Sequence, residues 1–143
     1  MAQNISDAHI LVSMTYVSRA NQEISAKEVD EILQQAQHNN AANAITGLLV
    51  FKDNIFLQTI EGSRAQINDL LCHLIADQRH YDLQVLETRE LEHREWSRWS
   101  MNYVPVTKEN AAIYLKYSTT TEFNPYVLSF ESVRGLMRDL GHA

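Results

Sequence analysis

Three polar side chains stand where their neighbours predict an apolar environment: Tyr16, Asn40 and Gln58. Gln58 lies in IFLQTIEG (55–62), a strand pattern in which its neighbours on the same face are large and apolar. A buried carboxamide without a partner costs about 1–3 kcal/mol, so such residues need a group to bond. A phenol and two amides that converge suit a flat heteroaromatic ligand, with apolar side chains against its faces and amides at its polar rim.

Each of these residues also has a structural interpretation when it is taken alone. Asn40 would cap the C-terminus of a helix, and Tyr16 would pack its ring and bond its hydroxyl to the backbone. Trp99 and Met101 share one face of the expected last strand, where such side chains normally belong to the core. The combination of residues, rather than any single one, predicts a binding site.

A second group of residues offers acid–base or metal chemistry. His73 and Asp77 are four residues apart on an expected helix, as in a surface ion pair or a general acid and base. Adding His80 gives a set of metal-type ligands, but the spacing is too loose to predict a metal site. Because no G-x-G-x-x-G or P-loop sequence occurs, no phosphate-binding loop is predicted.

The elements that must position these residues follow the order β-α-β-β-α-β-β. Two helices begin at capping boxes, Ser25 with Glu28 and Ser63 with Gln66. Strands are expected at 9–18, 45–51, 55–62, near 81–87 and near 99–106. This order predicts an α+β fold of the ferredoxin-like type, with both helices on one face of a mainly antiparallel sheet.

The second and third strands are apolar on both faces, which predicts that the other face of the sheet is covered as well. Helical patterns in 109–117 and 129–141 are expected to cover it, with Gly141 as the stop signal of the second helix.

Composition excludes several classes of protein. The net charge of −6 comes without a basic stripe, which argues against nucleic acid as a partner. The single cysteine, Cys72, cannot form an internal disulfide and fits a reducing compartment. No apolar run reaches the ~18 residues of a membrane helix, and the polar N-terminus is not a signal peptide. We therefore expect a cytoplasmic protein that binds no membrane.

Four stretches resemble the BLUF domain, a flavin-binding sensor of blue light: LVSMTYVSR, NNAANAITGLLVFKDNIFLQTIEG, DQRHY and WSRWSM. They keep the family's order and spacing from about Ile10 to Val104, and the tail resembles the short PixD-type members. The resemblance implies FAD as the cofactor, although no motif separates FAD from FMN. It also implies a photosensor domain at 1–105, a C-terminal helical cap or output segment at 106–143, and no enzymatic activity.

The resemblance also implies roles for individual residues. Tyr16 and Gln58 match the photoactive tyrosine and the glutamine between it and the flavin, so light would drive electron and proton transfer from Tyr16 through Gln58. Trp99 and Met101 match the pair linked to signal output. The expected cofactor-binding residues, of which Ile32, Phe56 and Ile75 follow from the apolar pattern alone, are Tyr16, Ile32, Asn39, Asn40, Phe56, Gln58, His73, Ile75, Asp77 and His80.

The expected output is a light-dependent interaction with another protein or copy. PixD-type members form ring assemblies and bind response-regulator-like partners, which implies a homo-oligomer and such a partner here. Two other interpretations stay open from the sequence. One is a small enzyme that uses His73 and Asp77 as acid and base. The other is an α+β interaction domain without photochemistry, whose amides only cap helices.

Overall fold

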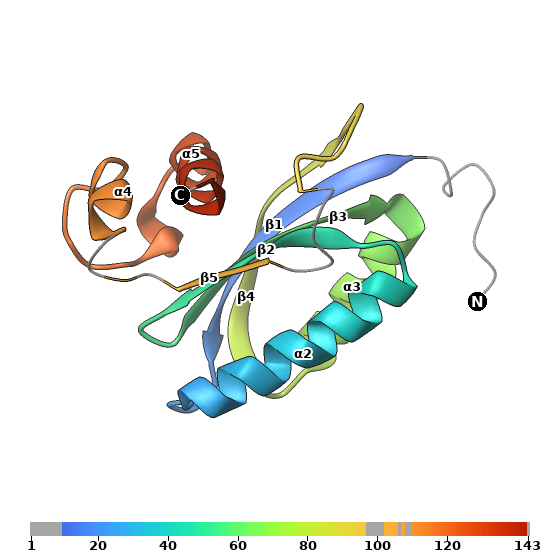
Figure 1. Ribbon diagram of the computed structural model, residues 1–143, viewed down its shortest axis with the longest axis horizontal. Coiled ribbons are helices and arrows are strands. Elements are labelled where there is room, and N and C mark those ends of the chain that lie inside the picture. Colours follow the sequence, from blue (N-terminus) through green and yellow to red (C-terminus); the bar gives the residue numbers. More distant parts are fainter. Residues whose placement is uncertain (1–9, 97–101, 106, 108–109, 143) are drawn as a thin grey trace.

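The computed structural model of the protein describes residues 10–96, 102–105, 107 and 110–142. Five strands form one sheet in the order β4-β1-β3-β2-β5 (Figure 1). All neighbouring strands are antiparallel except β2 and β5, which are parallel. The elements are β1 (Leu11–Ala20), α2 (Ala26–Ala42), β2 (Thr46–Lys52), β3 (Ile55–Ser63), α3 (Arg64–Ala76), β4 (His80–Glu90), β5 (Asn102–Pro105), α4 (Ala111–Leu115), η1 (Pro125–Val127) and α5 (Phe130–Gly141).

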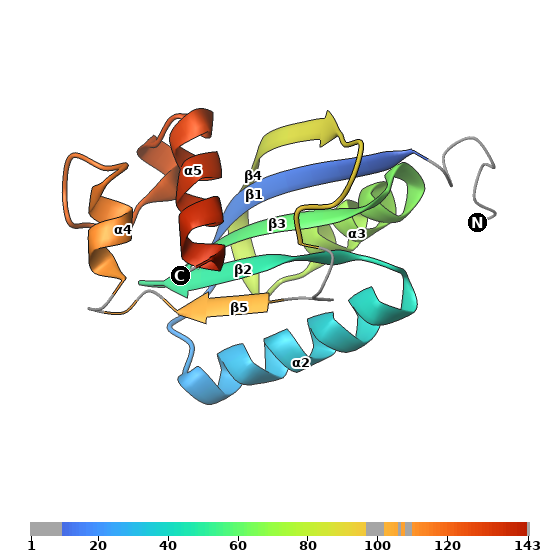
Figure 2. The same ribbon diagram turned by 45° about the horizontal axis from the view of Figure 1, so that its top comes forward.

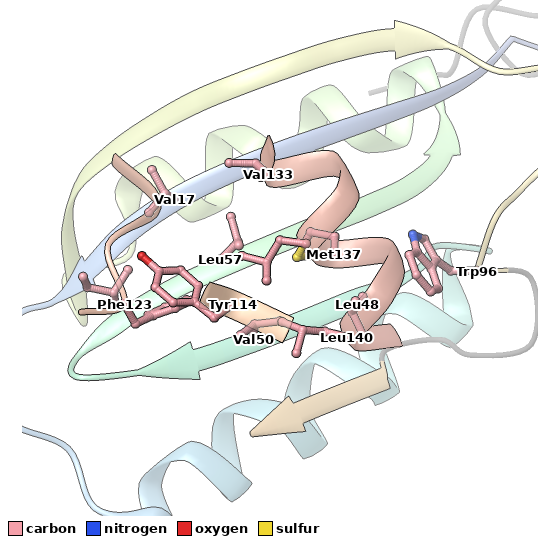
Figure 3. Close-up of a cluster of buried hydrophobic side chains, with 12 residues drawn as sticks. Val17, Leu48, Val50, Leu57, Trp96, Tyr114, Phe123, Val133, Met137 and Leu140 are labelled. Atoms are coloured by element: carbon pink, nitrogen blue, oxygen red, sulfur yellow. The ribbon is translucent and has the colours of Figure 1, made fainter. Parts of the chain in front are cut away.

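The sheet is covered on both faces (Figure 1, Figure 2). Helices α2 and α3 lie on one face, and α4, η1 and α5 lie on the other. Side chains of β3 alternate between the two cores: Ile55 and Leu57 face the C-terminal elements, and Phe56 and Ile60 face α2 and α3. Figure 3 shows the core on the α5 side. The predicted ferredoxin-like α+β fold and the covering of the second face are confirmed.

Both predicted helix N-termini are confirmed. Ser25 accepts a hydrogen bond from the backbone N–H of Glu28, whose carboxylate accepts one from the backbone N–H of Ser25. Ser63 accepts a hydrogen bond from the backbone N–H of Gln66 at 3.3 Å. These bonds satisfy N–H groups that have no partner within the helix, and they fix where α2 and α3 begin.

The β2–β3 hairpin closes through a two-residue turn. Asp53 and Asn54 have φ angles of 53° and 63°, the combination that type I′ turns require and that Asp and Asn tolerate. A turn of this length fixes the pairing of β2 with β3. On its other side β3 pairs with β1, and there Tyr16 lies directly opposite Gln58.

The first C-terminal helix, α4, is shorter than the helix that its sequence pattern predicts. We expected helix across 109–117, but α4 has only five residues, Ala111–Leu115. Ser118 and three threonines follow it, and these residues compete with helix through local hydrogen bonds or lose side-chain freedom in it. Helix α5 starts after its N-cap Ser129 as predicted, and it includes Gly141 rather than stopping before it.

One strand, β4, also differs from the prediction. β4 extends further than expected, over His80–Glu90, because it pairs with β1 through two register shifts. β5 spans Asn102–Pro105, and the predicted signalling residues Trp99 and Met101 lie outside the described residues. None of the helices in the described part of the chain has the length and hydrophobicity that a membrane span requires.

The C-terminal end of α5 packs against Trp96, which follows β4. The indole is buried and stacks on the His142 imidazole, with ring centroids 5.4 Å apart. A Cβ atom at Gly141 would lie 2.4 Å from two atoms of the indole, so a glycine is needed for this close approach.

We predict that Gly141→Ala destabilises the protein. Forcing a methyl group into a filled core costs about 1–3 kcal/mol, and alanine recovers at most about 1 kcal/mol through its helix propensity. Urea unfolding of the two proteins measures the difference. An unchanged unfolding midpoint would show that the indole moves aside without cost.

Candidate functional site

A cavity of about 580 Å³ lies between the sheet and helices α2 and α3. Apolar side chains from both layers line it, namely Ile32, Ala36, Ile45, Leu49, Phe56, Leu70, Leu74 and Ala76. Its polar lining consists of Tyr16, Gln35, Asn39, Asn40, Asn43, Gln58, Gln66, Asp69, His73, Asp77, Arg79 and His80. The cavity therefore combines aliphatic and aromatic walls with a phenol, several carboxamides and charged groups, as small-molecule sites do.

All of the predicted cofactor-binding residues except Ile75 line this cavity. Ile75 is 66% exposed, so the prediction that it contacts the cofactor through the apolar stripe of α3 is wrong. Ile67 is the buried residue of this helix. At ~100° per residue, eight positions bring Ile75 about 80° away from Ile67 around the helix axis. This rotation turns the Ile75 side chain away from the sheet.

Tyr16 and Gln58 form a buried hydrogen-bonded pair at the cavity. The Tyr16 hydroxyl donates to Gln58 Oε1, and the two residues are 3% and 6% exposed. Their opposite positions on β1 and β3 make this contact direct. Burial, followed by the negative charge of Asp77, raises the pKa of the Tyr16 phenol well above its ordinary value of 10.0.

Asn40 lies in the last turn of α2, and the interpretation of it as the C-cap residue, which the sequence left open, is wrong. Its backbone carbonyl closes the end of α2 by accepting hydrogen bonds from Ile45 N at 2.9 Å and Asn43 N at 3.1 Å. Its side chain is 4% exposed and lines the cavity. The C-cap residue itself is Asn43. Asn39, by contrast, is exposed and contributes to the lining from the helix surface.

Arg79 is a cavity residue that sequence reasoning missed. Its guanidinium donates to both carboxylate oxygens of Asp77, at 2.6–3.0 Å, and to Gln35 Oε1 at 3.2 Å. These bonds join α2 to the loop between α3 and β4. Hydrogen bonding to Arg79 lowers the pKa of Asp77, and the same bond raises the pKa of Arg79. The only signal in the sequence was the position of Arg79 inside DQRHY.

The two histidines of the cavity bond to groups other than Asp77. His73 Nδ1 lies 2.8 Å from the Asp69 carbonyl oxygen one turn earlier in α3. His80 Nδ1 lies 2.8 Å from Ser18 Oγ, and His80 Nε2 lies 2.5 Å from the Leu74 carbonyl oxygen. Asp77 forms its ion pair with Arg79, so the surface pair predicted between His73 and Asp77 is replaced by another contact.

A metal ion would have to be bound by several of the described side chains together. Among the residues that the structure describes, no group of three or more histidine, cysteine or carboxylate side chains is placed to hold a metal ion.

The donor set fits the ring system of a flavin. The cavity offers apolar contacts for a flat tricyclic ring, and Asn40 and Gln58 offer amide donors and acceptors for polar ring edges. Asp77, Arg79 and His73 add charged and polar groups at the same cavity. Fold and cavity together define a ferredoxin-like domain with a site for one heteroaromatic cofactor.

Comparison with known proteins identifies the family. The chain matches the family model of BLUF, sensors of blue-light using FAD, over residues 11–102. Photoactivated adenylate cyclase subunit beta of Euglena gracilis is 30% identical over 92 residues, which are 64% of this chain and 11% of that protein. The blue light- and temperature-regulated antirepressor BluF of Escherichia coli (strain K12) is 27% identical over 74 residues, 52% of this chain and 18% of that protein. The chain thus spans a small part of these relatives' length.

Solved structures agree with this assignment. The photo-activated state of BlsA aligns with a TM-score of 0.85 at 30% identity, over 93% of this chain and 96% of that chain. The dark state of the BLUF protein BlrB aligns with a TM-score of 0.79 at 27% identity, over 94% and 98% of the two chains. The chain belongs to the BLUF family, the sensors of blue light that use FAD.

The raised pKa of Tyr16 predicts a loss of stability at alkaline pH. Above its ordinary pKa of 10.0 the phenol loses its proton in the unfolded chain but keeps it in the native protein. The contribution of Tyr16 is therefore complete below about pH 10 and falls as pH rises towards the native pKa, by up to about 1.4 kcal/mol per pH unit.

Urea unfolding of the wild type and Tyr16→Phe between about pH 9 and 11 tests this prediction, because phenylalanine does not titrate. The wild type should lose stability more steeply. Equal slopes for the two proteins would show that the phenol ionises in the native state as readily as in the unfolded chain.

Proposed function

We propose that this domain senses blue light through the buried Tyr16–Gln58 pair beside FAD in the cavity between the sheet and helices α2 and α3. The observation that carries the proposal is the hydrogen bond from the Tyr16 hydroxyl to Gln58 Oε1 at a cavity with flavin-like complementarity. Family membership supplies the class of function, and the Tyr16–Gln58 pair supplies the proposed mechanism.

The proposed binding residues divide by chemistry. Ile32, Leu49 and Phe56 would contact the faces of the flavin ring, and Asn40 and Gln58 would bond its polar edges. His73, Asp77, Arg79 and His80 would hold the more polar end of the cofactor. Because Arg79 also bonds Gln35 of α2, it would help to close the cavity around a bound molecule.

The protein's part in the light reaction is to hold and move one proton. FAD held by these residues would supply the absorption of blue light and, in its excited state, the oxidant. Tyr16 would be the electron and proton donor, and its raised pKa keeps the proton on the phenol oxygen in the dark. The proton would leave along the hydrogen bond to Gln58 Oε1, and the electron and a proton would then return to Tyr16, so that no net chemistry occurs. Both residues are nearly fully buried, and a cofactor that fills the cavity would keep water away from them as a competing acceptor.

Gln58 would store the result as a changed hydrogen-bond pattern. Its carboxamide has an acceptor and a donor end of similar size, so rotation or tautomerisation exchanges what it offers to Tyr16 without a change of volume. One rearranged hydrogen bond is worth about 0.5–1.5 kcal/mol. This amount shifts a balanced conformational equilibrium by roughly two- to tenfold, which suits a sensor whose output states are close in energy.

For the output we propose a photosensor at 1–105 and an output segment at 106–143. The C-terminal elements pack on the sheet face opposite the cavity, so a change in the sheet reaches them through the shared core. The expected receivers are another copy of the chain or a response-regulator-like protein. The relatives include a photoactivated adenylate cyclase subunit and an antirepressor, so proteins similar to this domain have different outputs.

We predict that Asn40→Ala weakens FAD binding by about 5- to 150-fold. Loss of the amide leaves polar groups of the bound cofactor without a partner, at about 1–3 kcal/mol. Ile75→Ala is the matched control, because Ile75 is exposed and does not line the cavity. Titration of the apoprotein with FAD measures both affinities. If Asn40→Ala and the wild type bind FAD with equal affinity, the Asn40 side chain does not contribute to FAD binding.

A rearranged Gln58 would donate a new hydrogen bond to the flavin, which would shift its absorption to the red. We predict that Tyr16→Phe and Gln58→Leu both retain FAD and both lose this light-induced red shift. Phenylalanine keeps the ring but lacks the oxidisable phenol, so the flavin fluorescence should rise. Leucine keeps the approximate volume but removes both the donor and the acceptor. Absorption spectra before and after blue light test the two variants. A normal reversible red shift in Gln58→Leu would overturn the proposed mechanism.

A further inference from the structure

A carboxylate is almost completely buried on the sheet face opposite the FAD cavity. Glu61 of β3 is 1% exposed. Its carboxylate accepts hydrogen bonds from the backbone N–H groups of Glu95 and Trp96, both at 2.9 Å, and from the Thr46 hydroxyl at 3.3 Å. Hydrogen bonds to a charged acceptor are roughly twice as strong as neutral ones. Glu61 therefore holds two consecutive peptide groups of the segment that follows β4.

Arg94 fastens the same segment to the sheet. Its guanidinium donates to Thr46 Oγ1 at 2.8 Å, to the Glu61 carbonyl oxygen at 3.1 Å and to the Ala44 carbonyl oxygen at 2.7 Å. Residues 94–96 lie outside the strands. We call them the 94–96 clasp, because polar bonds rather than strand pairing attach them to β2 and β3.

The clasp ends in the side chain that contacts α5. The Trp96 indole is buried and belongs to the core on the α5 side (Figure 3). It stacks on the His142 imidazole. The absence of a Cβ at Gly141 allows the helix backbone to lie against this indole. The indole therefore contacts the backbone at the C-terminal end of α5 directly. A displacement of Trp96 would push on the helix itself, because no flexible side chain lies between them.

The interface between α5 and the sheet is not filled beside Glu61. A cavity of about 20 Å³ is lined by Thr59, Glu61 and Trp96 and by Phe130 and Arg134 of α5. This is space for about one water molecule. Buried Arg134 Nε has no hydrogen-bond partner among the described residues. Helix α5 thus packs on a polar, incompletely filled area next to the Glu61 carboxylate. A small shift of α5 relative to the sheet would cause few steric clashes there.

We infer that Glu61 is a positioning residue that couples β3 to α5 through the 94–96 clasp and Trp96. Glu61 and Gln58 are three residues apart on β3, so their side chains lie on opposite faces of the same strand. A rearrangement of Gln58 that shifts β3 moves the carboxylate and both peptide groups that it holds. The inference rests on the proposed function, because it takes Gln58 as the residue that responds to light.

The test is hydrogen exchange of the α5 amides in the full, FAD-loaded chain, measured by mass spectrometry in the dark and under blue light. In the wild type, exchange over 130–142 should differ between the two conditions. Glu61→Gln keeps the shape of the side chain but turns one N–H group towards a backbone N–H group. It should retain the red shift, exchange α5 amides more than about tenfold faster in the dark, and lose the light–dark difference.

Asp139→Asn is the matched control. It also changes a carboxylate to an amide, and it weakens bonds of α5 to Lys116 and Tyr117 without touching the clasp. Exchange of α5 should become faster in this variant, but the light–dark difference should persist. If Asp139→Asn also abolishes the difference, any loosening of α5 has the same effect and the inference is refuted.

Thr46→Val is a milder second variant, because it keeps the branched shape and removes only the hydroxyl shared by Glu61 and Arg94. It should reduce the light–dark difference in α5. A full wild-type difference in either Glu61→Gln or Thr46→Val would refute the inference. A wild type with a normal red shift but no light effect on α5 would refute it too. A wild type without any red shift would instead refute the proposed function.

Discussion

The pairing register of β1 with β3 is the constraint on which the rest of the molecule depends. It sets Tyr16 opposite Gln58 on one face of the sheet and Thr15 opposite Thr59 on the other. Because side chains alternate in a strand, a slip of one residue would exchange the two faces. A slip of β1 would put the phenol under α5 and separate it from the carboxamide, which β3 would keep at the cavity. The sheet therefore carries two functional surfaces that share a single backbone alignment.

The polar side chains in the two cores form hydrogen bonds with each other instead of with water. Tyr16 bonds Gln58 on the cavity side, and Thr15 bonds Thr59 on the α5 side. Apolar residues at these positions would pack without any requirement for hydrogen bonding. Polar pairs add directionality, because each pair is satisfied only in particular orientations. A core built this way has a small number of discrete hydrogen-bond arrangements, which a core of aliphatic side chains does not have.

Site residues that interrupt a local apolar pattern could be predicted from the sequence. Site residues that fit their local pattern could not. Tyr16 and Gln58 were found because they interrupt apolar strand faces. Arg79 was not predicted as a cavity residue, because a charged residue in a loop fits a solvent-exposed position. Its partner Gln35 also lies on another element. The helical period predicted α3 but placed Ile75 on the wrong side of it. Glu61 was also beyond sequence reasoning, because two of its partners are backbone N–H groups 34 and 35 residues further along the chain.

The parallel contact of β5 with β2 has a consequence for the order of folding. Leu48 pairs with Asn102, about fifty residues later, whereas β2 and β3 are joined by a two-residue turn. The entropy of closing so long a loop delays such contacts, so β5 should join a sheet whose other strands have already paired. β5 is also a short strand at the edge of the sheet, bonded on one side. Its detachment would break its pairing with β2 and leave the β1–β3 pair intact.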